Sequence, residues 1–376
     1  MNSGTLMSLV PMALLSLCAT ASVAGADSPT PETLKQAVHG RFLIGVAVNA
    51  QMLADTTTGP LIAAQFDCLT GENAFKPISL EALQGQFTFD EADRIADFAM
   101  AHHMKLIGHN LCWHQQSPAW LYQDAAGNPL PRDMALKNLH DYIFAVVGHF
   151  KGKVFGWDVV NEALDDGPGY LRDTPALRSI GPDFVQQAFE FAHQADPKAE
   201  LYYNDYNIEE PGKREKALRL VRDLKAHGVR IDAVGIQGHW QVNTPALSVI
   251  EDAIKAFQAL GVKVGITELD VDPLPRQGNS ADITAIETGG MNPYVNGFPD
   301  SEQQKLAQRY SDLFTLFARH SGEIERVTFW GLDDGQSWLN NFPVPGRTNY
   351  PLLFDRQDKP KPAFFAVVDA LNRVSK

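Results

Sequence analysis

Apolar, strand-like runs alternate with helical periodicity along almost the whole chain, and this alternation constrains the fold more than any other feature. Eight short apolar runs have the length and composition of strands that are buried on both faces. These runs are 42–48, 64–69, 105–109, 154–160, 200–203, 233–237, 263–268 and 327–331. Helical periodicity is found at 91–103, 134–149, 183–194, 213–227, 246–260, 302–320 and 362–374. This alternation predicts a parallel sheet with right-handed crossovers, and eight units over this length favour a closed barrel over an open sheet.

The chain is long enough for one such barrel and shows no sign of a second module. Its 376 residues contain no internal repeat or low-complexity linker. We therefore predict a single α/β domain, a (β/α)8 TIM barrel, over residues 27–376. The chain has 32 Lys and Arg against 45 Asp and Glu, a net charge of −13. Nucleic acids and anionic membranes need a basic face, so this charge argues against both as partners and permits a neutral polymer.

Residues 1–26 differ in composition from the rest of the chain. The run 9–24 is apolar and uncharged, and small residues follow it at 24–26. This pattern is typical of a secretory signal peptide, and the run is short for a membrane span. Lys and Arg are absent before it, which leaves a membrane anchor or an artefactual start as alternatives. We expect a secreted protein, periplasmic or extracellular, with no membrane contact once the signal peptide is removed.

Two cysteines, Cys68 and Cys112, follow the expected signal peptide. Both lie in apolar, strand-like surroundings, so we expect buried free thiols that pack as small hydrophobic side chains. A disulfide between neighbouring strands in an oxidising compartment is the alternative. Neither cysteine shows metal-ligand spacing.

Two of the apolar runs end on carboxylates, which a strand buried on both faces tolerates only at a rim or with partners. They are Trp157-Asp-Val-Val-Asn161-Glu162 and Gly265-Ile-Thr-Glu268-Leu-Asp270. Because the carboxyl ends of barrel strands face the substrate, polar and aromatic residues at the other strand ends are candidates too. These are Glu72, Asn73, Lys76, His109, Trp113, His114, Gln116, Asn204, Tyr206, Gln237, His239, Trp330 and Trp338. Sugars need hydrogen-bonding groups and aromatic plates, and paired carboxylates that flank a bond are the machinery of glycoside hydrolysis.

Each of these residues has a simpler explanation when it is taken alone. A single Glu at a strand end is more often solvated, a single His is more often structural, and the Trp residues fit a core. His109 and His114 are five positions apart on a strand-to-loop segment, which is poor metal geometry, so we expect no metal and no cofactor. The convergence of one type of group on seven of the eight strand ends favours a sugar site.

Longer sequence blocks contain these candidates. The blocks are Glu72-Asn-Ala-Phe-Lys76-Pro77, Gly108-His-Asn-Leu-Cys-Trp113-His-Gln-Gln116, Trp157-Asp-Val-Val-Asn161-Glu162-Ala, Tyr203-Asn-Asp-Tyr206-Asn207, Gly235-Ile-Gln-Gly-His239, Ile266-Thr-Glu268-Leu-Asp270, Thr328-Phe-Trp330-Gly-Leu-Asp-Asp-Gly-Gln-Ser-Trp338, Pro351-Leu-Leu-Phe-Asp355 and Lys359-Pro-Lys-Pro362. In this order, over nearly the whole chain after the signal peptide, they resemble the endo-β-1,4-xylanases of glycoside hydrolase family 10. Any one block is weakly specific, whereas the ordered set is very specific.

The resemblance implies that Glu162 is the acid/base and Glu268 the nucleophile of a retaining double displacement. An acid must stay protonated near neutrality, so burial or a nearby carboxylate must raise its pKa; a nucleophile needs hydrogen-bond donors to stay ionised. We expect His239 to donate to Glu268, Asp270 to orient that imidazole, and Asn161 to bond the sugar 2-hydroxyl. By resemblance, the −1 sugar is lined by His109, Trp113, Gln116, Gln237 and Trp330. The next non-reducing sugar is held by Glu72, Asn73, Lys76 and Trp338, and Asn204 and Tyr206 reach toward the leaving side.

The chain also departs from the family pattern. Asn110 stands where a small hydroxyl residue is common, the Pro- and Gly-rich segment 271–299 is longer than in compact members, and no carbohydrate-binding module is visible. If segment 271–299 lies on the catalytic face, a functional loop and a solvent-exposed loop without a function are equally consistent with the sequence. Calcium in this loop stays open, because oxygen ligands are available without a diagnostic spacing; they are Asp272, Asn279, Asp282 and Asn292.

The expected activity is endo-hydrolysis of xylan and xylo-oligosaccharides by a monomer. A related retaining hydrolase that acts on β-glucan or aryl glycosides is one alternative. A carbohydrate-binding protein on a barrel scaffold is the other, although a binder need not keep both Glu162 and Glu268.

Overall fold

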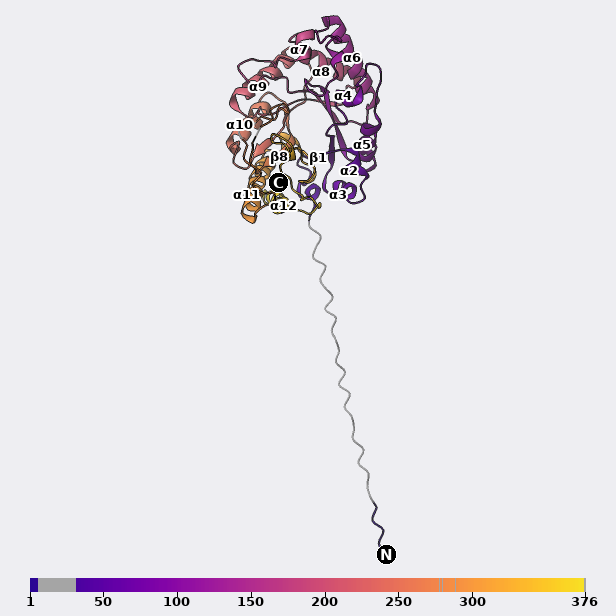
Figure 1. Cartoon of the computed structure of the whole chain (residues 1–376), viewed down its shortest axis with the longest axis vertical. Helices are drawn as coiled ribbons and strands as arrows, with labels where there is room; N and C mark the ends of the chain where they lie inside the picture. Colours follow the sequence, from indigo (N-terminus) through magenta and orange to yellow (C-terminus); the bar gives the residue numbers. More distant parts are fainter. Residues whose placement is uncertain (6–31, 277, 279, 288, 375–376) are drawn as a thin grey trace. The chain divides into compact units, whose positions relative to one another are not determined.

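The computed structural model shows a closed barrel of eight parallel strands. They are β1 (Leu43–Val48), β2 (Cys68–Gly71), β3 (Lys105–Cys112), β4 (Gly156–Asn161), β5 (Glu200–Asp205), β6 (Ala233–Ile236), β8 (Lys263–Asp272) and β9 (Ile324–Phe329). Strands β1 to β6 pair in chain order, β9 lies between β1 and β8, and β6 pairs with β8 to close the ring. A short strand, β7 (His239–Gln241), pairs with the far end of β8, where His239 lies opposite Asp270. The predicted (β/α)8 barrel is confirmed (Figure 1).

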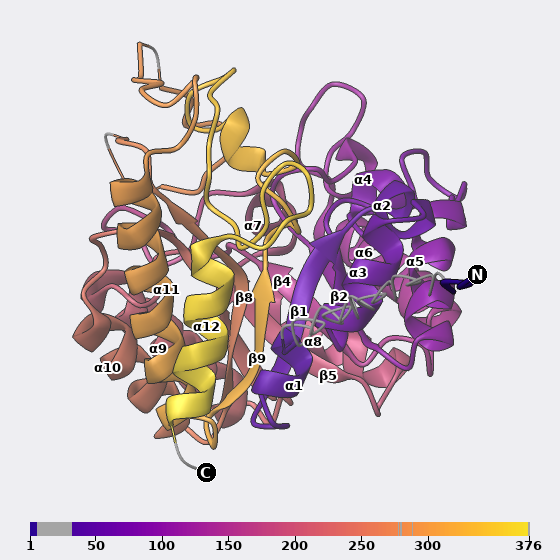
Figure 2. The same ribbon diagram turned by 90° about the horizontal axis from the view of Figure 1, so that it is seen from below.

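Helices cover the outside of the barrel, as two perpendicular views show (Figures 1 and 2). The predicted helices are present with ends that differ by a few residues: α5 (Asp90–Ala101), α6 (Arg132–His149), α8 (Phe184–Ala195), α9 (Pro211–Ala226), α10 (Leu247–Gln258), α11 (Asp300–Arg319) and α12 (Pro362–Arg373). In α10 the buried residues are Ile250, Ala253, Ile254 and Phe257. That spacing of three to four residues places one apolar face against the barrel.

Several shorter elements are not predicted by the periodicity. They are α1 (Leu34–Ala37), α2 (Ala50–Ala54), α3 (Thr58–Gln65), α4 (Pro77–Leu80), α7 (Pro175–Ile180) and the 3₁₀ turns η1 (Ala119–Leu121) and η2 (Trp338–Asn340). Helices of one or two turns are too short to establish a period. For the same reason the second strand is predicted too early: residues 64 and 65 end α3, and β2 begins at Cys68. Strand β8 is longer than predicted, because its last residues pair with β7.

The two cysteines are buried free thiols. Cys68 belongs to a small cluster with Ile107, Tyr202 and Ala233, whereas Cys112 belongs to the larger hydrophobic core. In the register of β2 and β3, Cys68 lies opposite Lys105, so Cys112 is seven residues further along the neighbouring strand. Seven residues of a strand span roughly 20 Å, which is too far for a disulfide.

The structure describes residues 1–5, 32–276, 278, 280–287 and 289–374. Most of the expected signal peptide therefore lies outside the described residues. The chain divides into two units at residue 31, and all the helices and strands named above belong to the second. None of the described helices combines the length and the apolar character that a membrane crossing needs.

Candidate active site

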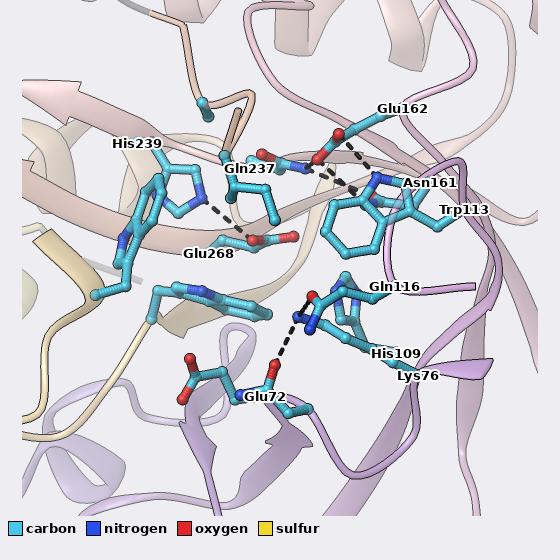
Figure 3. A pocket seen from close by; sticks show the side chains of 15 residues that line it. Glu72, Lys76, His109, Trp113, Gln116, Asn161, Glu162, Gln237, His239 and Glu268 are labelled. Carbon is cyan, nitrogen blue, oxygen red and sulfur yellow. Dashed lines mark hydrogen bonds and ion pairs between the residues drawn. The ribbon is translucent and has the colours of Figure 1, made fainter. Parts of the chain in front are cut away.

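Most of the predicted site residues line one pocket at the carboxyl ends of the strands (Figure 3). They are Glu72, Asn73, Lys76, His109, Trp113, Gln116, Asn161, Glu162, Gln237, His239, Glu268, Trp330 and Trp338. Ala281 and Ile283, in the segment after β8, also line the pocket and are not predicted individually. The structure thus brings together side chains that are up to 266 positions apart in the sequence, from Glu72 to Trp338.

Glu162 follows the last residue of β4 and has an unusual backbone conformation. Its φ of 55° lies in the left-handed region, which costs a non-glycine residue on the order of 1–3 kcal/mol. Two hydrogen bonds hold the backbone there: its N–H donates to the Asn204 carbonyl (2.9 Å), and Arg172 Nε donates to its carbonyl (3.2 Å). This turn directs the carboxyl group into the pocket, where Figure 3 shows it beside Trp113 and Gln237.

The Glu162 carboxyl group is buried and has a donor on each oxygen. Trp113 Nε1 donates to Oε2 (2.9 Å), and Gln237 Nε2 donates to Oε1 (2.9 Å). Burial raises the pKa of Glu162 to about 7, and the negative charge of Asp205 adds to this effect, while the two donors oppose it. Near neutral pH a large fraction of Glu162 therefore carries a proton that it can donate.

The Glu268 carboxyl group, which belongs to β8, has the opposite protonation behaviour. Burial alone would raise its pKa, but the hydrogen bond from His239 and the imidazole of His109 outweigh burial, so the pKa of Glu268 is lowered. His239 Nε2 lies 3.2 Å from Oε2, and Asn204 Nδ2 donates to Oε1 at 2.7 Å. Between the lowered pKa of Glu268 and a pH of about 7, Glu268 is thus ionised while Glu162 is protonated.

His239 is held as a cation between two carboxylates. Its Nδ1 lies 3.0 Å from Asp270 Oδ2. Burial would lower the pKa of His239, but the charge of Asp270 and the bonds to Asp270 and Glu268 raise it to about 9. Both ring nitrogens are then donors, one toward each carboxylate. Trp338 Nε1 donates to the same Asp270 oxygen (2.7 Å), which ties an aromatic wall of the pocket to this unit.

A second polar group surrounds Lys76. Its Nζ donates to Asn73 Oδ1 (2.8 Å) and Gln116 Oε1 (2.7 Å), and it lies 5.1 Å from the centroid of the Trp113 ring. Burial lowers the pKa of Lys76 and raises that of Glu72, and the opposite charge of each residue moderates the shift of the other. This part of the pocket offers fixed donors and acceptors beside an aromatic face, as a sugar requires.

His109, Trp330 and Trp338 complete the pocket walls. His109 Nδ1 lies 2.9 Å from Asp158 Oδ2 inside the barrel. Trp330 meets the rings of His109 and His239 edge to face, with centroids 5.2 and 6.3 Å apart. Trp338 stacks on Phe342 with centroids 4.5 Å apart.

Asn204 and Tyr206 are predicted to reach toward the leaving side, but in the structure both are buried outside the pocket lining. Neither lines the pocket, and they are 0% and 1% exposed. Asn204 Nδ2 donates to both Glu268 Oε1 and Asn161 Oδ1, so it supports pocket residues from behind. The Tyr206 hydroxyl accepts from Arg172 Nη2 (2.7 Å) and donates to Asp166 Oδ2. Their positions after a strand predicted the correct end of the barrel but not the side on which they point.

Asp205 and Arg172 act on Glu162 and are not predicted by the strand-end pattern. Asp205 is 0% exposed and is bonded by Lys213 Nζ (2.8 Å) and the Tyr203 hydroxyl (2.5 Å). The sequence signals for Asp205 are its position directly after Asn204 and its place in the block at 203–207.

Asn110, which departs from the family pattern, is buried in β3, and its side-chain amide has no hydrogen-bond partner among the described residues.

The loop residues considered as calcium ligands do not support a calcium site. Asp272 is bonded by Arg347 (3.2 Å) and Asn349 (2.9 Å), and Asp282 is bonded by Gln115 and Arg172. Asn279 lies outside the described residues. Within the part of the chain that the structure describes, no group of three or more His, Cys, Asp or Glu could hold a metal ion.

The sequence profile described as Glycosyl hydrolase family 10 matches residues 33–370. The chain belongs to this family. It is 43% identical over 342 residues to endo-1,4-beta-xylanase A of Xylanibacter ruminicola, with 89% of this chain and 92% of that protein covered. It is 40% identical over 338 residues to endo-1,4-beta-xylanase B of Paenibacillus barcinonensis, with 89% and 97% covered.

Solved structures agree with this assignment. A family 10 endoxylanase retrieved from a sugarcane soil metagenome matches with a TM-score of 0.84 at 38% identity, with 90% of this chain and 99% of that chain covered. As a member of family 10, the chain is a glycoside hydrolase on a (β/α)8 barrel.

Proposed function

We propose that this chain is an endo-1,4-β-xylanase, which hydrolyses β-1,4-xylosidic linkages within xylan and xylo-oligosaccharides with retention of configuration. One observation carries the proposal: two buried glutamates line the same pocket with pKa values shifted in opposite directions. A protonated and an ionised carboxyl group beside one sugar are the acid and the nucleophile of a double displacement. The names of the relatives support xylan as the substrate.

In the first step Glu162 protonates the glycosidic oxygen while Glu268 attacks the anomeric carbon. The leaving sugar departs, and a covalent glycosyl-enzyme forms on Glu268. Glu162, now ionised, takes a proton from water, which displaces Glu268 and restores the β configuration. This requires carboxyl groups about 5–5.5 Å apart, whereas inversion would require about 6.5–9.5 Å.

The neighbouring residues keep each glutamate in its protonation state. His239, held by Asp270, donates to Glu268 and stabilises it as an anion and as a leaving group in the second step. Asn161 bonds one carboxyl group directly and is linked to the other through Asn204: its Nδ2 donates to Glu162 Oε1 (3.2 Å), and its Oδ1 accepts from Asn204, which also donates to Glu268. A bond from Asn161 to the sugar 2-hydroxyl would strengthen in the oxocarbenium-like transition state.

The substrate-binding roles follow the arrangement of the pocket. We assign the −1 sugar to His109, Trp113, Gln116, Gln237 and Trp330. We assign the next non-reducing sugar to Glu72, Asn73, Lys76 and Trp338. Trp338 and Gln116 would crowd a hydroxymethyl group, which favours xylose over glucose by a finite factor.

We also propose that the protein is secreted and acts as a monomer. The composition of residues 1–26 supports export. Export would also be needed because xylan is a polymer that lies outside the cell. Mass spectrometry of the N-terminus of the protein recovered outside the cytoplasm tests the predicted cleavage after residue 26, and an uncleaved N-terminus in that fraction would contradict it.

Initial rates on xylan, xylo-oligosaccharides and cello-oligosaccharides test the substrate. We expect xylan to lose viscosity faster than reducing ends accumulate, as in endo-cleavage. A clash with one additional group predicts cello-oligosaccharide rates lower by about 10–200-fold. Equal or faster cleavage of cello-oligosaccharides would make the enzyme a β-glucanase, and tight xylan binding without sugar release would make it a carbohydrate-binding protein.

A further inference from the structure

The segment after β8 is tied to two other loops at one residue, Asp282. Gln115 Nε2, from the loop after β3, donates to Asp282 Oδ1 at 2.8 Å. Arg172 Nη1, from the loop after β4, donates to Asp282 Oδ2 at 3.2 Å. Asp282 also accepts from the N–H (2.9 Å) and the hydroxyl (2.7 Å) of Thr284, which shapes its own segment. The Asp282 N–H also donates to Ser280 Oγ (3.2 Å), so hydrogen bonds hold the segment on both sides of Asp282.

Both of the loops that Asp282 joins also bond Glu162. Arg172 Nε donates to the Glu162 carbonyl at 3.2 Å, and Trp113, two residues before Gln115, donates to the Glu162 carboxyl group. Asp282 is therefore bonded to loops on the Glu162 side of the pocket. Because the acid protonates the departing oxygen, this is the side on which the leaving sugar must lie.

Ala281 and Ile283, which flank Asp282, both line the pocket. Ala281 is 5% exposed, whereas Ile283 is 40% exposed. Apart from these two apolar side chains, the lining is polar or aromatic. The C–H faces of a xylose ring are apolar and favour contact with such a surface. On the same segment Ile286 is 50% exposed and is not part of the pocket lining, so it serves as a matched comparison.

We propose that Ile283 is a specificity-determining residue that forms an apolar wall for the leaving sugar. Asp282 is a positioning residue, which holds Ile283 at the pocket through its bonds to Gln115 and Arg172. This inference rests on the proposed function and adds to it the surface that the leaving sugar contacts. The wall contributes to cleavage only when the leaving group is a sugar large enough to touch it.

The test compares two substrates whose leaving groups differ greatly in size. Xylopentaose releases a sugar, whereas β-xylobiosyl fluoride releases a single atom that is too small to reach the loop. For Ile283→Ala we expect kcat/KM on xylopentaose to fall about fivefold, and kcat/KM on the fluoride to stay within about twofold. End-labelled xylopentaose should also be cleaved at shifted positions. Ile286→Ala should change none of these quantities.

A double-variant cycle tests the role of Asp282. If Asp282 acts by placing Ile283, Asp282→Ala should give the same selective loss on xylopentaose, and the double variant should be no worse than Asp282→Ala alone. Thermal unfolding of each variant monitors the fold, and Ile283→Ala, at a half-exposed site, should leave it unchanged. An additive double variant would overturn the positioning role.

The inference and the proposed function fail in different ways. Equal losses on xylopentaose and the fluoride, or equal effects of Ile283→Ala and Ile286→Ala, would overturn the apolar wall alone. A wild-type protein that cleaves neither substrate would instead overturn the xylanase proposal.

Discussion

The two ends of the barrel each hold a pair of glutamates, and the pairs differ in how their protons are arranged. At the carboxyl end, Glu162 and Glu268 line the pocket, and their pKa values are shifted in opposite directions. At the amino end, the Tyr202 hydroxyl lies 2.5 Å from Glu200 and 2.6 Å from Glu325. Burial, followed by the hydrogen bond to Glu325, raises the pKa of Glu200 to about 7.

The supply of donors explains the difference. Glu268 has donors of its own in His239 and Asn204, and Glu162 has Trp113 and Gln237. A hydroxyl group has only one proton to donate, so Tyr202 can satisfy one of its two carboxylates at a time, and the pair is best satisfied when the carboxyl groups hold a proton between them. Two close carboxylates therefore form a catalytic pair only when separate partners give them different roles.

Buried charges lie between the two ends of the barrel. Arg326 is 0% exposed; its Nη2 donates to Asp158 Oδ1 (3.0 Å), and its guanidinium lies 5.1 Å from the Tyr202 ring centroid. The other oxygen of Asp158 faces His109. A buried ion pair is weak evidence for stability. Here Arg326 and Asp158 neutralise each other in the part of the barrel between the pocket and the amino end.

Removal of the nucleophile should have the largest effect. We expect Glu268→Ala to lower kcat for all glycosides by roughly 10⁴-fold or more, the scale seen when a nucleophile of a covalent mechanism is lost. Azide added to this variant should attack from the vacated side and give the α-glycosyl azide. Measurement of rates with and without azide, and of the product anomer, tests the comparison; unchanged sugar release from xylan would remove Glu268 from its role.

Removal of the acid should depend on the leaving group. Glu162→Ala should lower kcat/KM by about 10²–10⁴-fold for xylo-oligosaccharides, because an alkoxide leaves poorly without a proton. For 2,4-dinitrophenyl β-xylobioside the loss should be much smaller, because this phenolate needs little help. Equal losses for both substrates would show that Glu162 and Glu268 are not divided into acid and nucleophile.

The pH profile of the activity should depend on the negative charge of Asp205, which lies near Glu162. Because the acid must be protonated, kcat/KM should fall as pH rises through about 7, the pKa of Glu162. The negative charge of Asp205 raises that pKa, so Asp205→Asn should move the falling limb to lower pH by roughly half a unit to one unit. Asp196→Asn, a substitution of another buried aspartate that precedes β5, is the control, and an equal shift in both variants would refute this cause.

The amino-end pair should affect stability and leave catalysis unchanged. We expect Glu200→Gln to keep kcat/KM within about twofold of wild type, because Glu200 makes no contact with the pocket. Its raised pKa means that the folded protein binds the proton more tightly than the unfolded chain. This stabilisation is fully present below about pH 4.5 and is lost as pH rises through about 7. The difference in thermal midpoint between Glu200→Gln and wild type should therefore change over this range, whereas the exposed control Glu215→Gln should show no such change.

The barrel and most of the pocket could be predicted because they depend on local patterns. Apolar runs and helical periods give the strands and helices, and the barrel topology places every strand end at one rim. The direction of a side chain at the rim depends on contacts that have no local pattern. Asn204 and Tyr206 do not line the pocket themselves; their side chains bond Glu268 and Arg172 respectively. Ile283 enters the pocket because Asp282 is held by two distant loops.

The configuration of the first product tests the central claim most directly. Proton NMR of the anomeric region, recorded in the first minutes of xylo-oligosaccharide hydrolysis before mutarotation, shows which anomer forms first. A nucleophilic Glu268 and an acid/base Glu162 predict the β anomer. Initial appearance of the α anomer would mean that water attacks directly and would contradict the assignment of the two glutamates.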